Sequence, residues 1–186
     1  MKATLVLLTL LFSTTSIPLA ACSSSFSSPT PQPAVAYNDR GTTKYQQGDA
    51  RGAIVEFDRA IAIDARYAEA YTNRAVAKLG LGDRQGAIND YSRAIEIDPQ
   101  DALTYYNRGV AKFELGDSRG AISDFDRAIA INPQDAETYT NRGAVKLTMG
   151  DKKGALADLR KGAELFRRQG QTADYAKTME LIRQAK

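Results

Sequence analysis

A period of 34 residues most constrains the fold of this chain. The phrase YTNRAVAK at 71–78 returns as YYNRGVAK at 105–112 and as YTNRGAVK at 139–146. A more divergent copy, YNDRGTTK, occupies 37–44. Repeats of this length are supersecondary units that bury their apolar faces only by stacking on neighbouring copies. We therefore divide the chain after residue 33 into four copies, 34–67, 68–101, 102–135 and 136–169, followed by a tail at 170–186.

Each copy carries the start and stop signals of two helices joined by a tight turn. A glycine that can adopt a left-handed conformation ends the first helix. The aspartate that follows it is a good N-cap for the second helix. Prolines at 99 and 133 stop the second helix in the two middle copies. The glycine–aspartate pairs are Gly48–Asp49, Gly82–Asp83, Gly116–Asp117 and Gly150–Asp151.

These repeats resemble the tetratricopeptide repeat (TPR) family. The shared features are an aromatic residue at position 4 of each copy, small residues at 8 and 20 and, in all but the last copy, an aromatic at 24. The copies depart from the family pattern at position 32, where Ala65 and Arg167 replace proline, and at position 27, where Gly162 replaces alanine. The resemblance implies an all-α fold: a right-handed TPR superhelix (α-solenoid) of four helix-turn-helix repeats. We expect 170–186 to form a capping helix that covers repeat four with Tyr175, Ala176, Met179 and Ile182.

The Asn-Arg pair of the repeated phrase has two predicted roles. The arginine at position 7 should pair across the hairpin with the acid at position 23, giving Arg40–Glu56, Arg74–Asp90, Arg108–Asp124 and Arg142–Asp158. The lysine at position 11 has no such partner, and we expect its aliphatic stem to lie on the edge of the core and its ammonium group to extend to solvent.

The asparagine at position 6 is expected to face the concave groove that the resemblance places along the first helices, without a core contact. Its amide both donates and accepts hydrogen bonds, which suits it to clamp an extended peptide. The alternative is that it only solvates the helix or belongs to the repeat consensus. The predicted peptide-binding residues are Asn38, Asn73, Val76, Tyr106, Asn107, Val110, Thr140 and Asn141. Lysines are missing from groove positions 2 and 5, which argues against a chaperone-tail clamp.

The first 21 residues have the layout of a secretory signal peptide. A lysine is followed by an apolar run from 3 to 12 and then by small residues. Leu19-Ala20-Ala21-Cys22 resembles the lipobox of bacterial lipoproteins, in which the cysteine is lipidated and becomes the first mature residue. Residues 22–33 would then be the lipidated cysteine and a Ser/Pro-rich tether. The resemblance implies a chain held in the bacterial cell envelope, at the outer membrane in a Gram-negative cell.

Composition argues against most other functions. The chain has one cysteine and no histidine, so neither an intrachain disulfide nor a Cys/His metal site can form. We expect no enzyme, no cofactor, no small-molecule substrate and no nucleic-acid partner. The cluster of basic residues in the last repeat is interpreted as a solvated face or a contact with anionic lipid or protein. The prediction is a membrane-tethered TPR adaptor that binds proteins or extended peptides. The alternative is an assembly factor, or pilot lipoprotein, dedicated to one envelope complex.

Overall fold

The computed structural model describes residues 33–185, and every regular element in that range is an α-helix. The prediction of an all-α fold is thus confirmed. The helices fall into two compact units, which are described separately. The N-terminal unit holds α1 (Pro33–Gln46), α2 (Ala50–Ile63), α3 (Ala68–Gly80), α4 (Arg84–Ile97), α5 (Ala102–Glu114) and α6 (Ser118–Ile131). The C-terminal unit holds α7 (Ala136–Thr148), α8 (Lys152–Arg168) and α9 (Thr172–Ala185).

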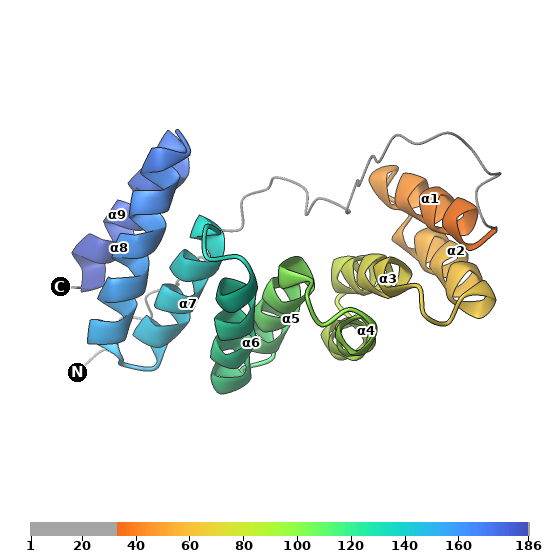
Figure 1. The fold of residues 1–186 in the computed structure, drawn as a ribbon, viewed down its shortest axis with the longest axis horizontal. Coiled ribbons are helices and arrows are strands. Elements are labelled where there is room, and N and C mark those ends of the chain that lie inside the picture. The colour runs from red at the N-terminus through yellow and green to blue at the C-terminus, as the bar shows by residue number, and fades with distance from the viewer. Residues whose placement is uncertain (1–32, 186) are drawn as a thin grey trace. The chain divides into compact units, whose positions relative to one another are not determined.

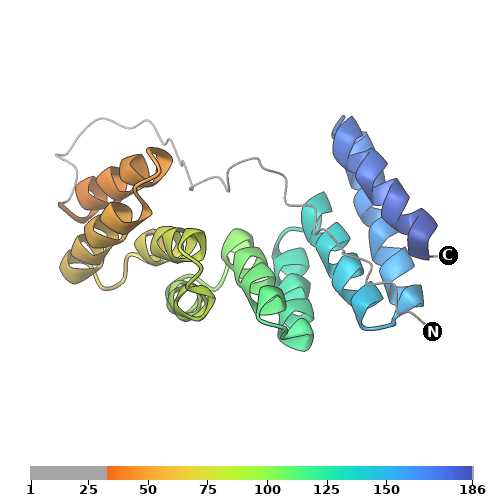
Figure 2. The same ribbon diagram turned by 180° about the vertical axis from the view of Figure 1, so that it is seen from behind.

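Consecutive helices pair as hairpins: α1 with α2, α3 with α4, α5 with α6, and α7 with α8 (Figures 1 and 2). Within the N-terminal unit each hairpin also packs on the next, through α2 against α3 and α4 against α5. In the C-terminal unit α9 packs on α8. No described helix is both long and apolar enough to cross a lipid bilayer.

One aspartate sets both helix ends at each hairpin turn. Gly48 adopts a φ of +86°, and the Asp49 N–H donates to the carbonyl of Lys44, 2.9 Å away, which closes the first helix. The Asp49 carboxylate then accepts the N–H of Gly52 at 2.8 Å and starts the second helix. A Cβ at position 52 would lie 1.9 Å from the Asp49 Oδ2, so a larger residue there would displace the capping carboxylate. The other three turns are built in the same way.

The two helices of each hairpin approach closely where small residues face large ones. A Cβ added to Gly41 would lie 2.5 Å from the Phe57 ring, and one added to Gly109 would lie 2.8 Å from the Phe125 ring. Phe57 and Phe125 are almost wholly buried. The predicted close packing at repeat positions 8, 20 and 24 is therefore present.

The helix ends differ where the outer repeats lack proline. In α8, Arg167 stands at the position of Pro99 and Pro133, and the helix continues to Arg168. The α2 helix ends at Ile63 even without a proline, because Asp64 leaves the helical conformation and accepts the N–H of Arg66 at 2.9 Å. The turn at Asp64 therefore ends a helix without proline, and the proline rule alone does not predict it.

The C-terminal helix lies against repeat four through a face that includes the predicted Tyr175 and Ile182 but not Ala176 and Met179. Thr178, Ile182 and Ala185 are buried and Tyr175 is half-buried, whereas Met179 is 41% exposed and Ala176 is also exposed. The helix therefore packs as expected but is rotated, so the prediction that Met179 and Ala176 cover the repeat is wrong. The threonine fits because its hydroxyl donates to the Asp174 carbonyl at 2.8 Å.

Candidate functional site

Each hairpin is crossed by an ion pair between its two helices. In the third hairpin the Arg108 guanidinium donates from Nε and Nη2 to the two oxygens of Asp124, at 2.9 and 2.7 Å. The Asp124 side chain is 4% exposed. The equivalent predicted pairs Arg40–Glu56, Arg74–Asp90 and Arg142–Asp158 are also present, which confirms this part of the sequence interpretation.

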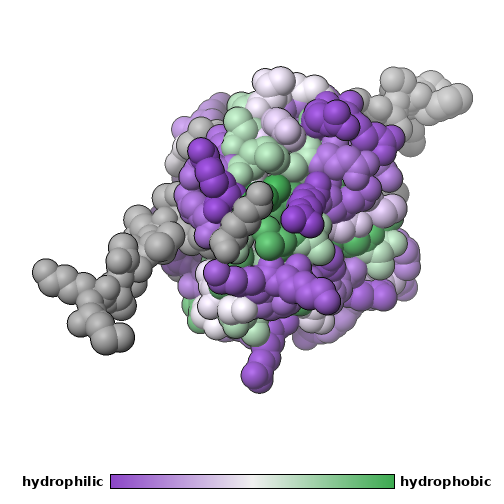
Figure 3. Space-filling model, turned by 90° about the vertical axis from the view of Figure 1, so that its left-hand side faces the viewer, coloured by the Kyte–Doolittle hydropathy of each residue, from purple (hydrophilic) through white to green (hydrophobic). Residues whose placement is uncertain are grey.

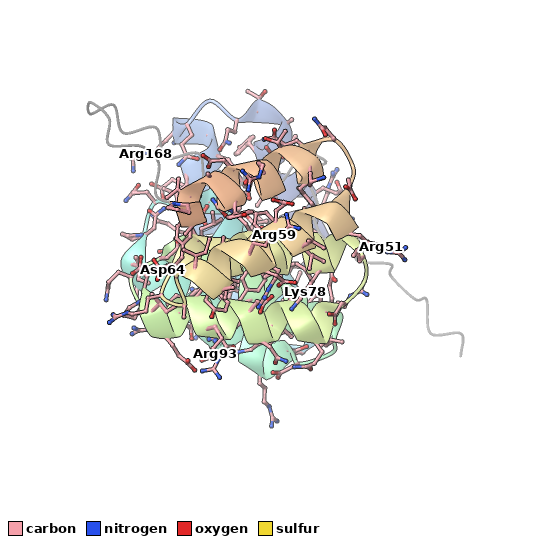
Figure 4. The ribbon with its side chains drawn as sticks, turned by 90° about the vertical axis from the view of Figure 1, so that its right-hand side faces the viewer. Arg51, Arg59, Asp64, Lys78, Arg93 and Arg168 are labelled. Carbon is pink, nitrogen blue, oxygen red and sulfur yellow. The ribbon has the colours of Figure 1, made fainter. Side chains whose placement is uncertain are left out.

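The repeated lysine shares the same carboxylate. Lys112 Nζ lies 2.7 Å from Asp124 Oδ2, and Lys78 and Lys146 each lie 2.8 Å from Asp90 and Asp158. The expectation that these lysines extend to solvent without a partner is wrong. Lys78 lies against the helices, while Arg51 and Arg93 project outward (Figure 4). In the first hairpin Lys44 lies 3.7 Å from Asp49 instead. We call each set of arginine, lysine and acid a seam cluster.

The repeated tyrosine completes the seam. The guanidinium carbon of Arg40 lies 4.1 Å from the centre of the Tyr37 ring, and the corresponding arginines lie 5.4 to 5.6 Å from Tyr71, Tyr105 and Tyr139. These distances are within the range of cation–π attraction. The tyrosine at position 4 and the arginine at position 7 therefore contact each other in each hairpin.

Seam arginines also join neighbouring hairpins of the N-terminal unit. Arg74 Nη1 lies 2.5 Å from Asp58, and Arg108 Nη1 donates to Ser92 Oγ at 3.0 Å. Burial lowers the pKa of Arg74, but hydrogen bonds to Asp90 and Asp58 outweigh it and raise the pKa above its ordinary value. Arg74 therefore stays charged and links three helices.

The asparagines of the repeated phrase are buried. Exposed fractions are 1% for Asn38, 2% for Asn73, 4% for Asn107 and 7% for Asn141. Asn73 Nδ2 donates to Asn38 Oδ1 at 3.0 Å, and Asn38 Nδ2 donates to Glu69 Oε1 at 3.2 Å. The expectation that the amides at position 6 have no core contact is wrong, because Asn73, Asn107 and Asn141 are buried and Asn73 bonds to Asn38 between α1 and α3.

This amide chain extends to a tyrosine. Tyr67 Oη donates to Glu69 Oε2 at 3.4 Å. Burial, and then the negative charge of Glu69, raise the pKa of Tyr67 to about 12. Further along the same unit, the hydroxyls of Thr72 and Thr104 hydrogen-bond at 3.0 Å. Polar contacts between first helices therefore set the register of α1, α3 and α5.

One buried amide group in this series is not satisfied. Asn107 Nδ2 has no hydrogen-bond partner among the described residues, and neither has the hydroxyl of Thr140 or Tyr91. Burial raises the pKa of the Tyr91 hydroxyl far above its ordinary value. An unpaired buried donor costs about 1–3 kcal/mol.

The remaining predicted binding residues divide by exposure. Val76 and Thr140 are buried at 2% and 1%. Tyr106 and Val110 are half-buried and lie on α5 with Leu103 and Phe113, also half-buried. These four residues are spaced three, four and three positions apart, so they form one stripe along the helix. The Tyr106 ring lies 5.9 Å from the Phe125 ring, which fixes its base against α6. We call this row the α5 stripe.

Sequence reasoning missed the caps of two first helices. The Asp101 and Asp135 carboxylates accept the N–H groups of Leu103 and Glu137, at 3.0 and 3.2 Å. Their carboxylates also accept the hydroxyls of Thr104 and Thr138. An aspartate stands three residues before a threonine in two successive copies, and this recurrence could have indicated the caps.

Paired helices, small residues at their crossings and an arginine–acid pair across every described hairpin define a helical-hairpin repeat protein. Models of the TPR repeat match residues 41–82 and 81–116, and a tetratricopeptide repeat model matches 102–135. Together they span 41–135, just over half of the 186 residues. The chain belongs to the tetratricopeptide repeat family. No curated protein sequence matches it.

Solved structures support the same fold. The MamA protein is 22% identical with a TM-score of 0.68, over 84% of this chain and 93% of that one. The first TPR of Spaghetti (RPAP3), bound to the HSP90 peptide SRMEEVD, is 23% identical with a TM-score of 0.63, over 65% and 96%. The second TPR domain of human RPAP3, in complex with the HSP70 peptide SGPTIEEVD, is 29% identical with a TM-score of 0.59, over 61% and 94%. The predicted signal peptide, the lipidated Cys22 and the tether before residue 33 lie outside the described residues.

Proposed function

We propose that this chain is a non-enzymatic adaptor that binds an extended segment of a partner protein along α1, α3 and α5. The observation that carries the proposal is the α5 stripe of Leu103, Tyr106, Val110 and Phe113. Its side chains are largely apolar and only half-buried, and the Tyr106 ring already lies against the buried Phe125 ring. Apolar surface of this kind gains about 25 cal/mol per Å² when a partner covers it.

The polar side chains of the repeats support the same conclusion because they already pair with one another and are not left for a ligand. The seam clusters use the arginines, lysines and acids within and between hairpins. Asn38 and Asn73 bond to each other rather than to open surface. We therefore assign Asn38, Asn73, Val76 and Thr140 a supporting role. Tyr106 and Val110 are assigned the contact role, and the unpaired Asn107 amide lies beside them in sequence on α5.

Related domains make a peptide the best-supported class of ligand. Two TPR structures similar to this chain contain an HSP90 or an HSP70 peptide. The chaperone-tail specificity itself is not carried over, because the corresponding positions here hold no lysines. The partner is therefore proposed to be a different segment, recognised by apolar side chains.

We place this adaptor at a membrane of the bacterial cell envelope. The lipobox Leu19-Ala20-Ala21-Cys22 supports a lipid on the cysteine, and the Ser/Pro-rich residues that follow would tether the repeats. In this proposal Cys22→Ser gives a chain that no longer fractionates with membranes after the signal is removed. A variant that is processed and still sediments with membranes would show that the anchor lies elsewhere.

Photocrosslinking in intact cells tests the binding face. A crosslinking amino acid replaces Tyr106 in one strain and the outward-facing Arg93 in another, and captured proteins are identified by mass spectrometry. We expect proteins captured at 106 and not at 93, with loss of capture when Val110→Asp is added. Equal capture at both positions contradicts the proposed face. Several captured proteins favour an adaptor, and one protein whose membrane placement fails without this chain favours a pilot.

A further inference from the structure

The C-terminal unit carries an open cleft between α8 and α9, separate from the α5 stripe. Its volume is about 330 Å³, and it is lined by Arg160, Ala163, Glu164, Arg167, Tyr175, Met179 and Ile182. Met179 borders the cleft instead of filling the core, and Ile182 forms part of its apolar lining.

The charges around the cleft are not balanced. Glu164 is shared by Lys161 at 3.3 Å and Arg168 at 3.8 Å. Arg160 and Arg167 are both exposed and have no ion pair or side-chain hydrogen bond among the described residues. The other acid of α8, Asp158, is already held by Arg142 and Lys146. The two arginines seven residues apart therefore lie two turns apart on one helix face with their donors free.

The arginines at this opening come from α8, and its large apolar side chains come from α9. Figure 3 views the side on which α8 and α9 lie in Figure 1, and it shows apolar surface (green) in a hollow between hydrophilic side chains (purple). Methionine is an adaptable apolar contact that accepts side chains of different shape. Guanidinium groups bind carboxylates through paired hydrogen bonds.

We propose that this cleft is a second interaction site, which binds an acidic segment of a partner protein. One large apolar side chain of that segment lies against Tyr175, Met179 and Ile182. Carboxylates on either side of it pair with Arg160 and Arg167. The proposed site uses α8 and α9 and shares no residue with the α5 stripe.

The shape of the site favours a peptide over a membrane. A bilayer presents a broad surface, and an anionic one attracts any cluster of basic residues. A concave cleft laid on such a surface leaves its apolar floor uncovered by lipid chains, whereas a single peptide side chain fills it. Basic residues of α8 outside the cleft, Lys152 and Lys153, provide a way to separate the two.

The test is selection from a library of random twelve-residue peptides displayed on phage, using the full chain purified in detergent. Peptides that bind are synthesised with a fluorescent label, and their dissociation constants are measured by anisotropy. We expect peptides rich in Asp and Glu around one large apolar residue. Arg160→Glu with Arg167→Glu should weaken their binding at least tenfold, and Met179→Ser should weaken it several-fold.

Two control variants decide the site. Lys152→Glu with Lys153→Glu makes the same change of charge on the same helix outside the cleft, and it should weaken binding less than threefold. Tyr106→Ala should have no effect, so failure of this proposal is distinguishable from failure of the α5 stripe. Recovery of no such peptides, equal losses in both charge variants, or peptide binding unchanged by Arg160→Glu with Arg167→Glu would each overturn the proposal. The same holds if liposomes of anionic phospholipid alone show the dependence on Arg160 and Arg167.

Discussion

Arg108 and Asp124 are sixteen residues apart, and their side chains join the two helices of one hairpin through two hydrogen bonds of 2.9 and 2.7 Å. Lys112 reaches the same carboxylate from one turn further along α5, at 2.7 Å. Asp124 is thus the carboxylate that Arg108 and Lys112 share. Removing the acid and removing one cation are therefore unequal perturbations.

We expect Asp124→Ala to lower the free energy of unfolding by about 3–5 kcal/mol, because it leaves two half-buried cations without their counter-charge. Arg108→Ala should lower it by less, about 1–3 kcal/mol, because Lys112 still pairs with the acid. Urea unfolding followed by circular dichroism measures both. Arg93→Ala is the control, since Arg93 is exposed and its one ion pair among residues 33–185 is with the equally exposed Glu96, and it should leave the unfolding midpoint unchanged. Equal losses from Asp124→Ala and Arg108→Ala would contradict the shared-acceptor arrangement.

Asn73→Ala and Asn107→Ala form a matched pair. Both remove a buried amide from the same repeat position. Asn73→Ala also leaves the Asn38 oxygen without its donor, at a cost of about 1–3 kcal/mol. Asn107→Ala removes an Nδ2 that has no hydrogen-bond partner in the described part of the chain, and alanine gains several tenths of a kcal/mol in helix propensity. Thermal melts should therefore show a clearly lower midpoint for Asn73→Ala, and a reversed order would contradict the bonding described for these amides.

Gly162 tests the packing of the last hairpin. Earlier copies hold alanine at this position, but a Cβ on Gly162 would lie 2.3 Å from Thr140 Oγ1 and 3.0 Å from the Ala136 carbonyl oxygen. Gly162→Ala should therefore destabilise the chain by about 1–3 kcal/mol through overpacking. Adding Thr140→Ala should restore part of the loss in denaturant unfolding. If the double variant is no more stable than Gly162→Ala alone, the threonine is not the obstacle.

Removing α9 by deleting 170–186 should lower thermal stability and cause aggregation, because Leu159 and Ala163 lose their cover. A point variant isolates the contact. Ile182→Ala should cost about 2–5 kcal/mol as a buried truncation. Met179→Ser, three residues earlier and largely exposed, should leave the melting temperature unchanged. A melting curve unaffected by the deletion would show that α9 does not stabilise repeat four.

Local and periodic features were predictable from the sequence. Glycine with a positive φ, an aspartate cap and a proline stop act within a few residues, so Gly48, Asp49 and Pro99 indicate helix ends directly. The Arg108–Asp124 pair was predictable because it recurs at fixed positions in every copy. An alignment of repeats exposes such pairs wherever both partners belong to one hairpin.

Contacts between copies and beyond the last copy were harder to predict. Asn73 looks open when one hairpin is considered alone, and its burial arises from α1 beside it. Lys112 was not assigned a partner because its acid was already assigned to Arg108. The rotation of α9 had no second copy for comparison, and a helix with Met179 and Thr178 side by side offers two plausible faces. The α5 stripe follows from helix periodicity, whereas the cleft at Arg160 and Arg167 depends on how α9 packs on α8.

The hairpin turn at Asp49 has a consequence for how such a chain changes length. Its backbone closes one helix and its side chain opens the next, with Gly48 and Gly52 shaped around it. Inserting one residue between Gly48 and Gly52 would change the spacing on which the contacts of Asp49 depend, so the turn should not tolerate it. A whole 34-residue copy brings its own glycines, its own aspartate and its own seam cluster. Duplication or loss of complete copies, rather than growth within one, is the change that this architecture accommodates.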